Sequence, residues 1–426
     1  MNSTVDLETQ IIKKKSVLPK TVWILGLMMF LMNLSFVMVF SLCGVYLKSK
    51  VGIKSGTIGA LENIGEGLSY TAKLFSGIIS DFLRRRKLVM IVGYGLIVIS
   101  RPLLAFASNP ILIFGSIFSE RLGNGIQGTP RDAMVSDVAP DDRKGACFGL
   151  KRSLATAGSF LGAVLAMLAM FWTFNDYQTV FLIATIPSFI AFLILIFVLK
   201  EPKTNESSVE EEKINKKRKY PIKLSDIPRL GGKFWLLMLV TAIFMYSRIG
   251  ETFIVLHAHE TFSLGETYTP VMMMLYNGSY ALLTFPLAHL SDKMNRATFL
   301  IMGIIALIAA DWFLWRADSF EMLIGGAVLW GIQMGLAQSM FAALISDVVP
   351  NDLRGTGFGF FYLVSAIFSV FSGVSAGYVA NTFGLSQTFA FSGIVGVVAL
   401  VVLLTLCAFG VMKRDPQLKK EMLSRK

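Results

Sequence analysis

The sequence has few charged residues, few cysteines and few histidines. Charged residues make up 16% of the 426 residues, whereas a soluble domain of this size has about one in four. The three cysteines, Cys43, Cys147 and Cys407, are too widely spaced to indicate disulfides or a metal site. The sequence also has no phosphate-binding glycine-rich loop and no nucleophile elbow, which disfavours an ATP-driven pump and a membrane enzyme. We therefore expect a protein without enzymatic activity, cofactor or metal.

Long apolar runs take the place of these features, and 54% of the residues are hydrophobic. A run of about 18 or more apolar residues can cross the bilayer, and it does so as a helix because its backbone must bond internally. The predicted fold class is therefore an all-α membrane protein. Twelve transmembrane helices are expected near residues 22–47, 57–80, 88–107, 110–136, 146–172, 178–199, 233–256, 268–290, 298–316, 320–346, 356–382 and 386–412.

Lysine and arginine lie almost entirely on one side of these spans. Twenty-eight of them fall in the N-terminal segment, alternate loops, the polar segment 200–232 and the tail, and four fall on the other side. Because loops rich in these residues stay in the cytoplasm, we predict a multi-pass protein of the cell inner membrane with both termini cytoplasmic. The net charge of +12 then reflects topology and attraction to the lipid bilayer rather than nucleic-acid binding.

The two halves of the sequence repeat each other weakly at a spacing near 210 residues. The loop 136–149 corresponds to 346–359, and Tyr70 corresponds to Tyr280. Repeated halves are typical of secondary transporters that rock around a central site. The predicted organisation is a cytoplasmic segment 1–21, a six-helix bundle 22–199, a cytoplasmic linker 200–232, a second six-helix bundle 233–412 and a cytoplasmic tail 413–426.

The loop after the second span resembles a known signature. Gly77, Asp81 and the basic run 84–87 resemble the loop motif of the major facilitator superfamily, with departures at Phe82 and Arg84, where that family usually has a basic residue and a glycine. Together with the repeat and the twelve spans, the resemblance covers essentially the whole chain. It implies two pseudo-symmetric bundles around a solute pathway in a bacterial inner membrane, and it assigns no subfamily.

The resemblance also implies a gating role for Asp81, and other charges at the cytoplasmic ends of the spans extend this prediction. A positive-inside loop and a structural network of ion pairs are the alternative explanations. The gating candidates are Gly77, Asp81, Arg85, Arg131, Asp132, Asp137, Asp292, Arg296 and Asp347.

Ionisable residues at bilayer depth usually face a cavity and are functional candidates. In span 2, Glu66 is the deeper carboxylate and the predicted proton carrier, whereas Glu62 is expected near the outer mouth, where hydration would account for it. In span 4, Arg121 with Asn124 and the following glycine resembles a family pattern associated with proton coupling. The proton-coupling candidates are Glu66, Glu62, Arg121 and Glu120.

Several further residues are predicted to line the solute cavity. Arg248 and Glu251 are three apart in the predicted helix 233–256 and can pair, while Arg152 either reaches the cavity or extends to the cytoplasmic interface. Inward-facing cations favour a solute that carries a carboxylate or another anionic group. The cavity candidates are Tyr70, Lys73, Arg152, Arg248, Glu251, Tyr276 and Tyr280.

The predicted function is proton-coupled secondary transport, as a symporter, of a small organic solute by a monomer. Efflux of amphipathic compounds or siderophores is an alternative that the 21 methionines and 34 phenylalanines favour. The incomplete antiporter pattern at Gly149, Gly158 and Gly162, with Ala163 in place of the usual proline, disfavours efflux. A transporter-like ligand sensor is a further alternative, which the short tail disfavours. A measurement of solute flux separates these functions.

Overall fold

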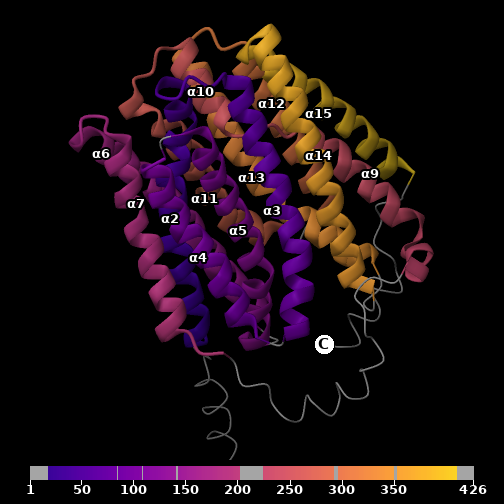
Figure 1. Cartoon of the computed structure of the whole chain (residues 1–426). Helices are drawn as coiled ribbons and strands as arrows, with labels where there is room; N and C mark the ends of the chain where they lie inside the picture. The colour runs from indigo at the N-terminus through magenta and orange to yellow at the C-terminus, as the bar shows by residue number, and fades with distance from the viewer. Residues whose placement is uncertain are drawn as a thin grey trace, which may run out of the picture.

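The computed structural model of the chain describes residues 18–83, 85–107, 109–140, 143–201, 224–291, 296–349 and 353–409. These residues form a bundle of long helices, and no strand occurs among them (Figure 1). By length and composition, nine helices in the described ranges can cross a membrane. The prediction of an all-α membrane protein is therefore confirmed.

Each predicted span coincides with helical structure to within a few residues. The first half contains α2 (Lys20–Ser49), α3 (Ser55–Leu83), α4 (Arg86–Ala105), α5 (Pro110–Val138), α6 (Lys144–Trp172) and α7 (Tyr177–Leu193), which continues as a π-helical turn, Ile194–Val198. The second half begins with a 3-10 helix, Leu224–Leu230. It continues with α9 (Gly231–Ser247), α10 (Thr252–Thr261), a 3-10 turn Glu266–Tyr268, α11 (Pro270–Ser291), α12 (Arg296–Trp315), α13 (Phe320–Val348), α14 (Arg354–Phe383) and α15 (Leu385–Ala408).

The seventh span is not one continuous helix, so the prediction of a single helix over 233–256 is wrong. The helix ends at Ser247 because Arg248 has an extended backbone (φ −79°, ψ 96°), and α10 begins only at Thr252. Within this break, a Cβ on Gly250 would lie 2.4 Å from a carboxylate oxygen of Glu62. The carboxylate of α3 thus approaches the backbone of the broken span closely at Gly250.

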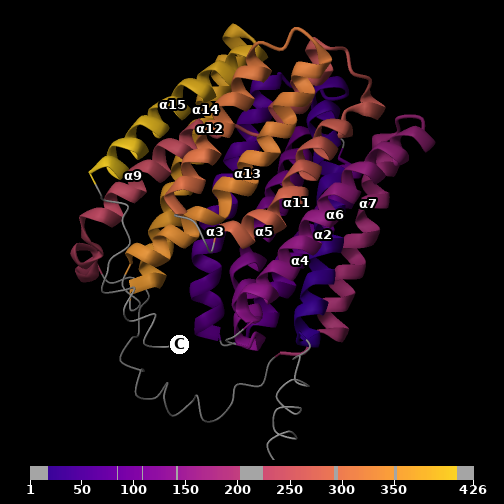
Figure 2. The same cartoon turned by 180° about the vertical axis from the view of Figure 1, so that it is seen from behind.

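The helices form two groups, and both groups extend between the same two opposite faces of the molecule (Figures 1 and 2). We name the face where α7 leads into its π-helical turn and α9 begins the linker face, and the face where α3 begins and α14 ends the far face. Helices α2, α4, α6 and α7 lie on one side, and α9, α12, α14 and α15 lie on the other. The first and second halves of the chain meet where α3 packs against α14 and where α6 packs against α11.

Close helix contacts in the first half depend on glycine. A Cβ on Gly158 or Gly162 of α6 would come within 2.2 or 2.4 Å of the carbonyl oxygens of Phe30 and Leu34 in α2. Small residues let helices approach closely in membranes. Helix packing therefore accounts for two of the three glycines that resemble the antiporter pattern.

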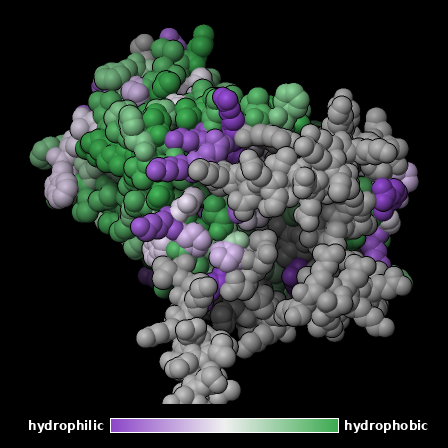
Figure 3. Space-filling model, turned by 90° about the horizontal axis from the view of Figure 1, so that it is seen from below, coloured by the Kyte–Doolittle hydropathy of each residue, from purple (hydrophilic) through white to green (hydrophobic). Residues whose placement is uncertain are grey.

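The outer surface of the bundle is largely apolar, as a lipid-facing surface must be. Large side chains such as Ile99, Phe171 and Val401 are more than half exposed there. Viewed from the linker face, hydrophobic residues cover much of one flank of the bundle (Figure 3).

Candidate functional site

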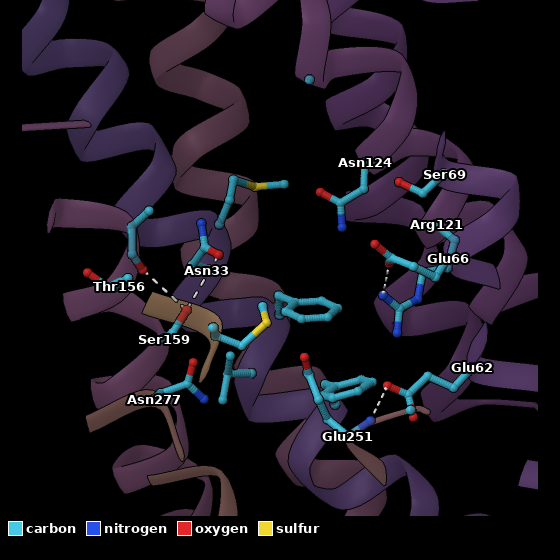
Figure 4. A pocket seen from close by; sticks show the side chains of 18 of the residues that line it. Asn33, Glu62, Glu66, Ser69, Arg121, Asn124, Thr156, Ser159, Glu251 and Asn277 are labelled. Atoms are coloured by element: carbon cyan, nitrogen blue, oxygen red, sulfur yellow. Dashed lines mark hydrogen bonds and ion pairs between the residues drawn. The ribbon is translucent and has the colours of Figure 1, made fainter. Parts of the chain in front are cut away.

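A cavity of about 290 Å³ lies between the two groups of helices (Figure 4). Most of its wall is formed by α2, α3, α5 and α6 from the first half, and by the break in the seventh span and α11 from the second. Single residues or pairs come from α4, α9, α13 and α14. The volume suits a small solute. The interface between repeated halves is also where secondary transporters hold their solutes.

Two predicted coupling residues contact each other on the first-half wall. An Nη1 atom of Arg121 in α5 lies 3.3 Å from Oε2 of Glu66 in α3 (Figure 4). The guanidinium group also lies over the rings of Phe36 and Phe40, at 5.3 and 5.1 Å from their centroids. These contacts fix the position of Arg121 and leave Glu66 facing the cavity.

Glu120, the residue before Arg121, takes part in a different contact. Its Oε2 atom lies 3.0 Å from Nη1 of Arg101 in α4, whose side chain is only 1% exposed. Arg101 also donates a hydrogen bond of 3.1 Å to the hydroxyl of Ser35. Glu120 lines a second, smaller cavity of about 40 Å³ rather than the main one. Glu62 and Arg121 line both cavities, whereas Glu120 lines the smaller one alone.

Glu62 does not lie in a hydrated outer mouth, so that expectation is corrected. It lines the main cavity, and its Oε1 and Oε2 atoms accept hydrogen bonds from the backbone N–H groups of Glu251 (3.1 Å) and Thr252 (2.9 Å) (Figure 4). Arg248 and Glu251 pair at 3.2 Å as predicted, although across the break rather than along a helix. Tyr276 donates a hydrogen bond of 2.8 Å to the same Glu251 carboxylate.

Cations gather in the part of the cavity nearer the linker face. The Lys73 ammonium lies 4.7 Å from the centre of the Tyr70 ring, and the Arg152 guanidinium lies 5.2 Å from the centre of the Tyr280 ring. Arg131 donates a hydrogen bond of 2.7 Å to Gln127. Among the described residues, Lys73 has no ion pair within 4 Å.

All seven predicted cavity residues lie on the wall of this one cavity. Their role in solute binding stays a prediction. Sequence reasoning missed several uncharged polar residues on the same wall, whose signal was an isolated asparagine or serine inside an apolar run. These residues include Asn33, Asn63, Asn124, Ser159 and Asn277.

The gating candidates near the linker face contact residues of their own half. Asp132 lies 3.3 Å from Arg131 and 2.6 Å from Lys151 of α6, and Asp137 pairs with Arg86. A Cβ on Gly77 would lie 2.9 Å from a methyl group of Thr129, which shows close packing of α3 on α5.

For the other gating candidates, the structure gives positions along the chain rather than side-chain contacts. Arg85 precedes α4, and Arg296 begins α12. Asp292 and the side chains of Asp81 and Asp347 lie outside the described part of the chain. Gating by this group of residues therefore stays a prediction.

The comparisons with known proteins cover almost all of the chain. The family profile described as Major Facilitator Superfamily matches residues 25–310 and 237–424. An uncharacterized MFS-type transporter of Methanocaldococcus jannaschii is 28% identical over 91% of this chain and 95% of its own length. A galactose-proton symporter of Escherichia coli is 27% identical over 30% of this chain and 26% of its own.

A solved structure shows the same fold. The crystal structure of a POT family transporter in complex with 5-aminolevulinic acid superposes with a TM-score of 0.73 over 93% of this chain and 97% of its own. The sequence identity is 15%, so the similarity concerns the fold alone.

Proposed function

The chain belongs to the Major Facilitator Superfamily, and we propose on that premise that it carries a small anionic organic solute across the membrane in exchange with or together with protons. In this proposal the protein is a monomer of the cell inner membrane, and the linker face and both termini lie in the cytoplasm. Alternating exposure of the cavity between the two halves would move the solute.

The observation that supports an anionic solute is the positive charge of the cavity wall near the linker face. Lys73, Arg131 and Arg152 line this part of the cavity. Among the described residues, Lys73 has no carboxylate within ion-pair distance, while Arg131 pairs with Asp132. In a site of low dielectric constant, an excess of positive charge attracts an anion strongly. A carboxylate also matches the fork of an arginine side chain.

Proton coupling rests on the carboxylates in the part of the cavity nearer the far face. Glu66 pairs with Arg121 in the resting cavity. A proton on Glu66 would neutralise the carboxylate and leave the Arg121 guanidinium available to an anionic solute. Solute and proton binding would then favour each other. The partial similarity to a galactose-proton symporter supports coupling of this kind.

The test is solute-driven proton movement in proteoliposomes that contain a pH-sensitive dye, with a panel of mono- and dicarboxylates, amino acids and amphipathic compounds. One anionic solute should move protons, and Glu66→Gln should abolish that movement. Glu321→Gln is the matched control because Glu321 is exposed in the first turn of α13, outside the cavity. Solute flux without proton movement would reject coupling, and saturable binding without flux would indicate a ligand sensor.

Export of amphipathic compounds is the second candidate, and the apolar part of the cavity wall favours it. Flexible, polarisable methionine side chains suit ligands of varied shape. Those on the cavity wall are Met29, Met32, Met245, Met273 and Met334. Proton movement driven by hydrophobic cations, and by no anionic member of the panel, would select this function instead.

A further inference from the structure

One carboxylate of the first half is bound to the broken span of the second. Glu62 of α3 accepts hydrogen bonds from the backbone N–H groups of Glu251 and Thr252, where α10 begins. The start of a helix carries partial positive charge and unpaired N–H groups, so it binds a carboxylate well. Gly250 leaves room for this contact, since a Cβ there would lie 2.4 Å from the Glu62 carboxylate.

The break is also held in position by neighbouring polar side chains. Its first carbonyl group, that of Arg248, accepts hydrogen bonds from Asn63 of α3 (3.4 Å) and Ser372 of α14 (3.0 Å). Ser369 of α14 in turn donates a hydrogen bond of 3.3 Å to the Asn63 carbonyl group. The break is therefore fixed between one helix of each half, and Glu62 supplies the charged part of the contact.

Further contacts at the far face join the same helices. A Cβ on Gly59 of α3 would lie 2.1 Å from the ring of Phe253 in α10, and Ser55 donates a hydrogen bond to Glu260. A Cβ on Gly56 would lie 2.1 Å from the Gly377 carbonyl oxygen in α14. The cavity can open to the far face only if α3 separates from α10 and α14.

Several ionisable groups face Glu62 from the elements around it. The break contributes Arg248 and Glu251, and α3 itself contributes Glu66. The smaller cavity, which Glu62 also lines, brings Cys43 of α2, Arg101 of α4, and Glu120 and Arg121 of α5. Among the described residues, none of the cations is within ion-pair distance of Glu62. The direct partners of Glu62 in the closed state thus come from Glu251 and Thr252 and include their two backbone N–H groups.

We propose that Glu62 is a latch that keeps the far face closed and that a proton releases. This inference rests on the proposed function. It assigns the proton-dependent opening of the far face to Glu62, whereas the proposed function assigns proton-coupled solute binding to Glu66. A proton on Glu62 removes the negative charge and turns one acceptor oxygen into a hydroxyl donor, so the carboxyl group no longer accepts both N–H groups as an anion. The contact between α3 and α10 is weakened, and proton binding and opening of the far face favour each other.

The test measures opening of the far face without any solute. Thr252→Cys is placed in a protein whose Cys43, Cys147 and Cys407 are replaced by serine. Thr252 is 4% exposed, and a Cβ on Gly44 of α2 would lie 2.4 Å from its methyl group, so a thiol there is covered while the far face is closed. A membrane-impermeant maleimide added at the far face then reports opening through its labelling rate.

Glu62→Gln should raise the labelling rate at neutral pH about tenfold, the effect of losing about one charged hydrogen bond. With Glu62 present, the rate should increase at acidic pH relative to a reference thiol at the exposed position of Glu321. In Glu62→Gln this pH dependence should be lost. Glu321→Gln is the control, because Glu321 is exposed in the first turn of α13 and lies outside the cavity, so the labelling rate of this variant should stay within about twofold.

Equal labelling of Glu62→Gln and the parent protein, or a pH dependence that persists in Glu62→Gln, would overturn the latch. If Glu62→Gln does not fold, Glu62→Asp gives the same test. The shorter carboxylate should label faster and keep the pH dependence, and an unchanged rate would overturn the proposal. Because no solute is present, a failure of this test is distinguishable from a failure of Glu66-dependent proton movement in proteoliposomes.

Discussion

The two halves of the molecule use the same pair of positions to join their third and fourth spans. In the first half, Arg101 of α4 forms an ion pair of 3.0 Å with Glu120 of α5. In the second half, 210 residues later in the sequence, Asp311 of α12 accepts a hydrogen bond of 3.2 Å from the indole of Trp330 in α13. The same two positions therefore contact each other in both halves. The contact is an ion pair in the first half and a hydrogen bond between an indole and a carboxyl group in the second.

The same difference holds around the cavity. Among the described residues, the second half contributes Arg248 and Glu251 as charged lining residues, and both belong to the break. The first half contributes Glu62, Glu66, Lys73, Arg101, Arg121, Arg131 and Arg152. We infer that the first half carries the ionic chemistry, while the second supplies the broken span together with Tyr276 and Tyr280.

The largest effect is expected from breaking the ion pair of the first half. Glu120→Ala would leave the Arg101 guanidinium buried without its carboxylate, which costs about 3–5 kcal/mol of unfolding free energy. Thermal unfolding in detergent should show a clearly lower transition temperature. Replacing both residues by methionine should restore most of the loss, since no charge remains buried. A single variant as stable as the double variant would contradict this account.

A smaller effect is expected from replacing Lys73, a cavity cation that has no ion pair among the described residues. Lys73→Gln should weaken binding of an anionic solute about tenfold, the size of one charged hydrogen bond, with little effect on stability. The matched control is Leu283→Ala at the corresponding position of the second half, which is not part of the cavity wall. Solute titration by calorimetry or transport kinetics measures the difference. Equal affinities of both variants would exclude Lys73 from the binding site.

The smallest effect is expected in the second half. Asp311→Asn keeps an oxygen that accepts the hydrogen bond from Trp330, and no described cation pairs with Asp311, so no charge is left without its partner. Unfolding free energy should change by about 1 kcal/mol or less. If Asp311→Asn destabilises the protein as much as Glu120→Ala does, the two halves do not differ in the way proposed here.

The sequence was sufficient to predict the helices but not their contacts. Hydrophobic runs located every span because each must cross the bilayer. The break at Arg248–Glu251 escaped prediction because apolar residues continue on both sides of it, from Phe244 to Val255. The contacts that hold the break come from the other half, where Glu62 binds the start of α10.

The partners of the charged residues likewise depend on how the helices rotate against one another. Helical periodicity puts Glu62, Glu66 and Lys73 on one face of α3, and all three line the cavity. It could not predict that Glu66 pairs with Arg121 while the adjacent Glu120 pairs with Arg101 of another helix. Neighbouring residues of a helix point in different directions, so each meets a different helix.

The central claim is that the two halves move against each other around the cavity, and a reversible cross-link at the far face tests it most directly. The side chains of Thr57 in α3 and Asn381 in α14 lie 3.5 Å apart. Thr57→Cys and Asn381→Cys, in a protein without its native cysteines, should form a disulfide on oxidation. Solute flux into proteoliposomes should stop in the oxidised protein and return on reduction, while each single variant transports normally under both conditions. Flux that continues through fully cross-linked protein would contradict the account.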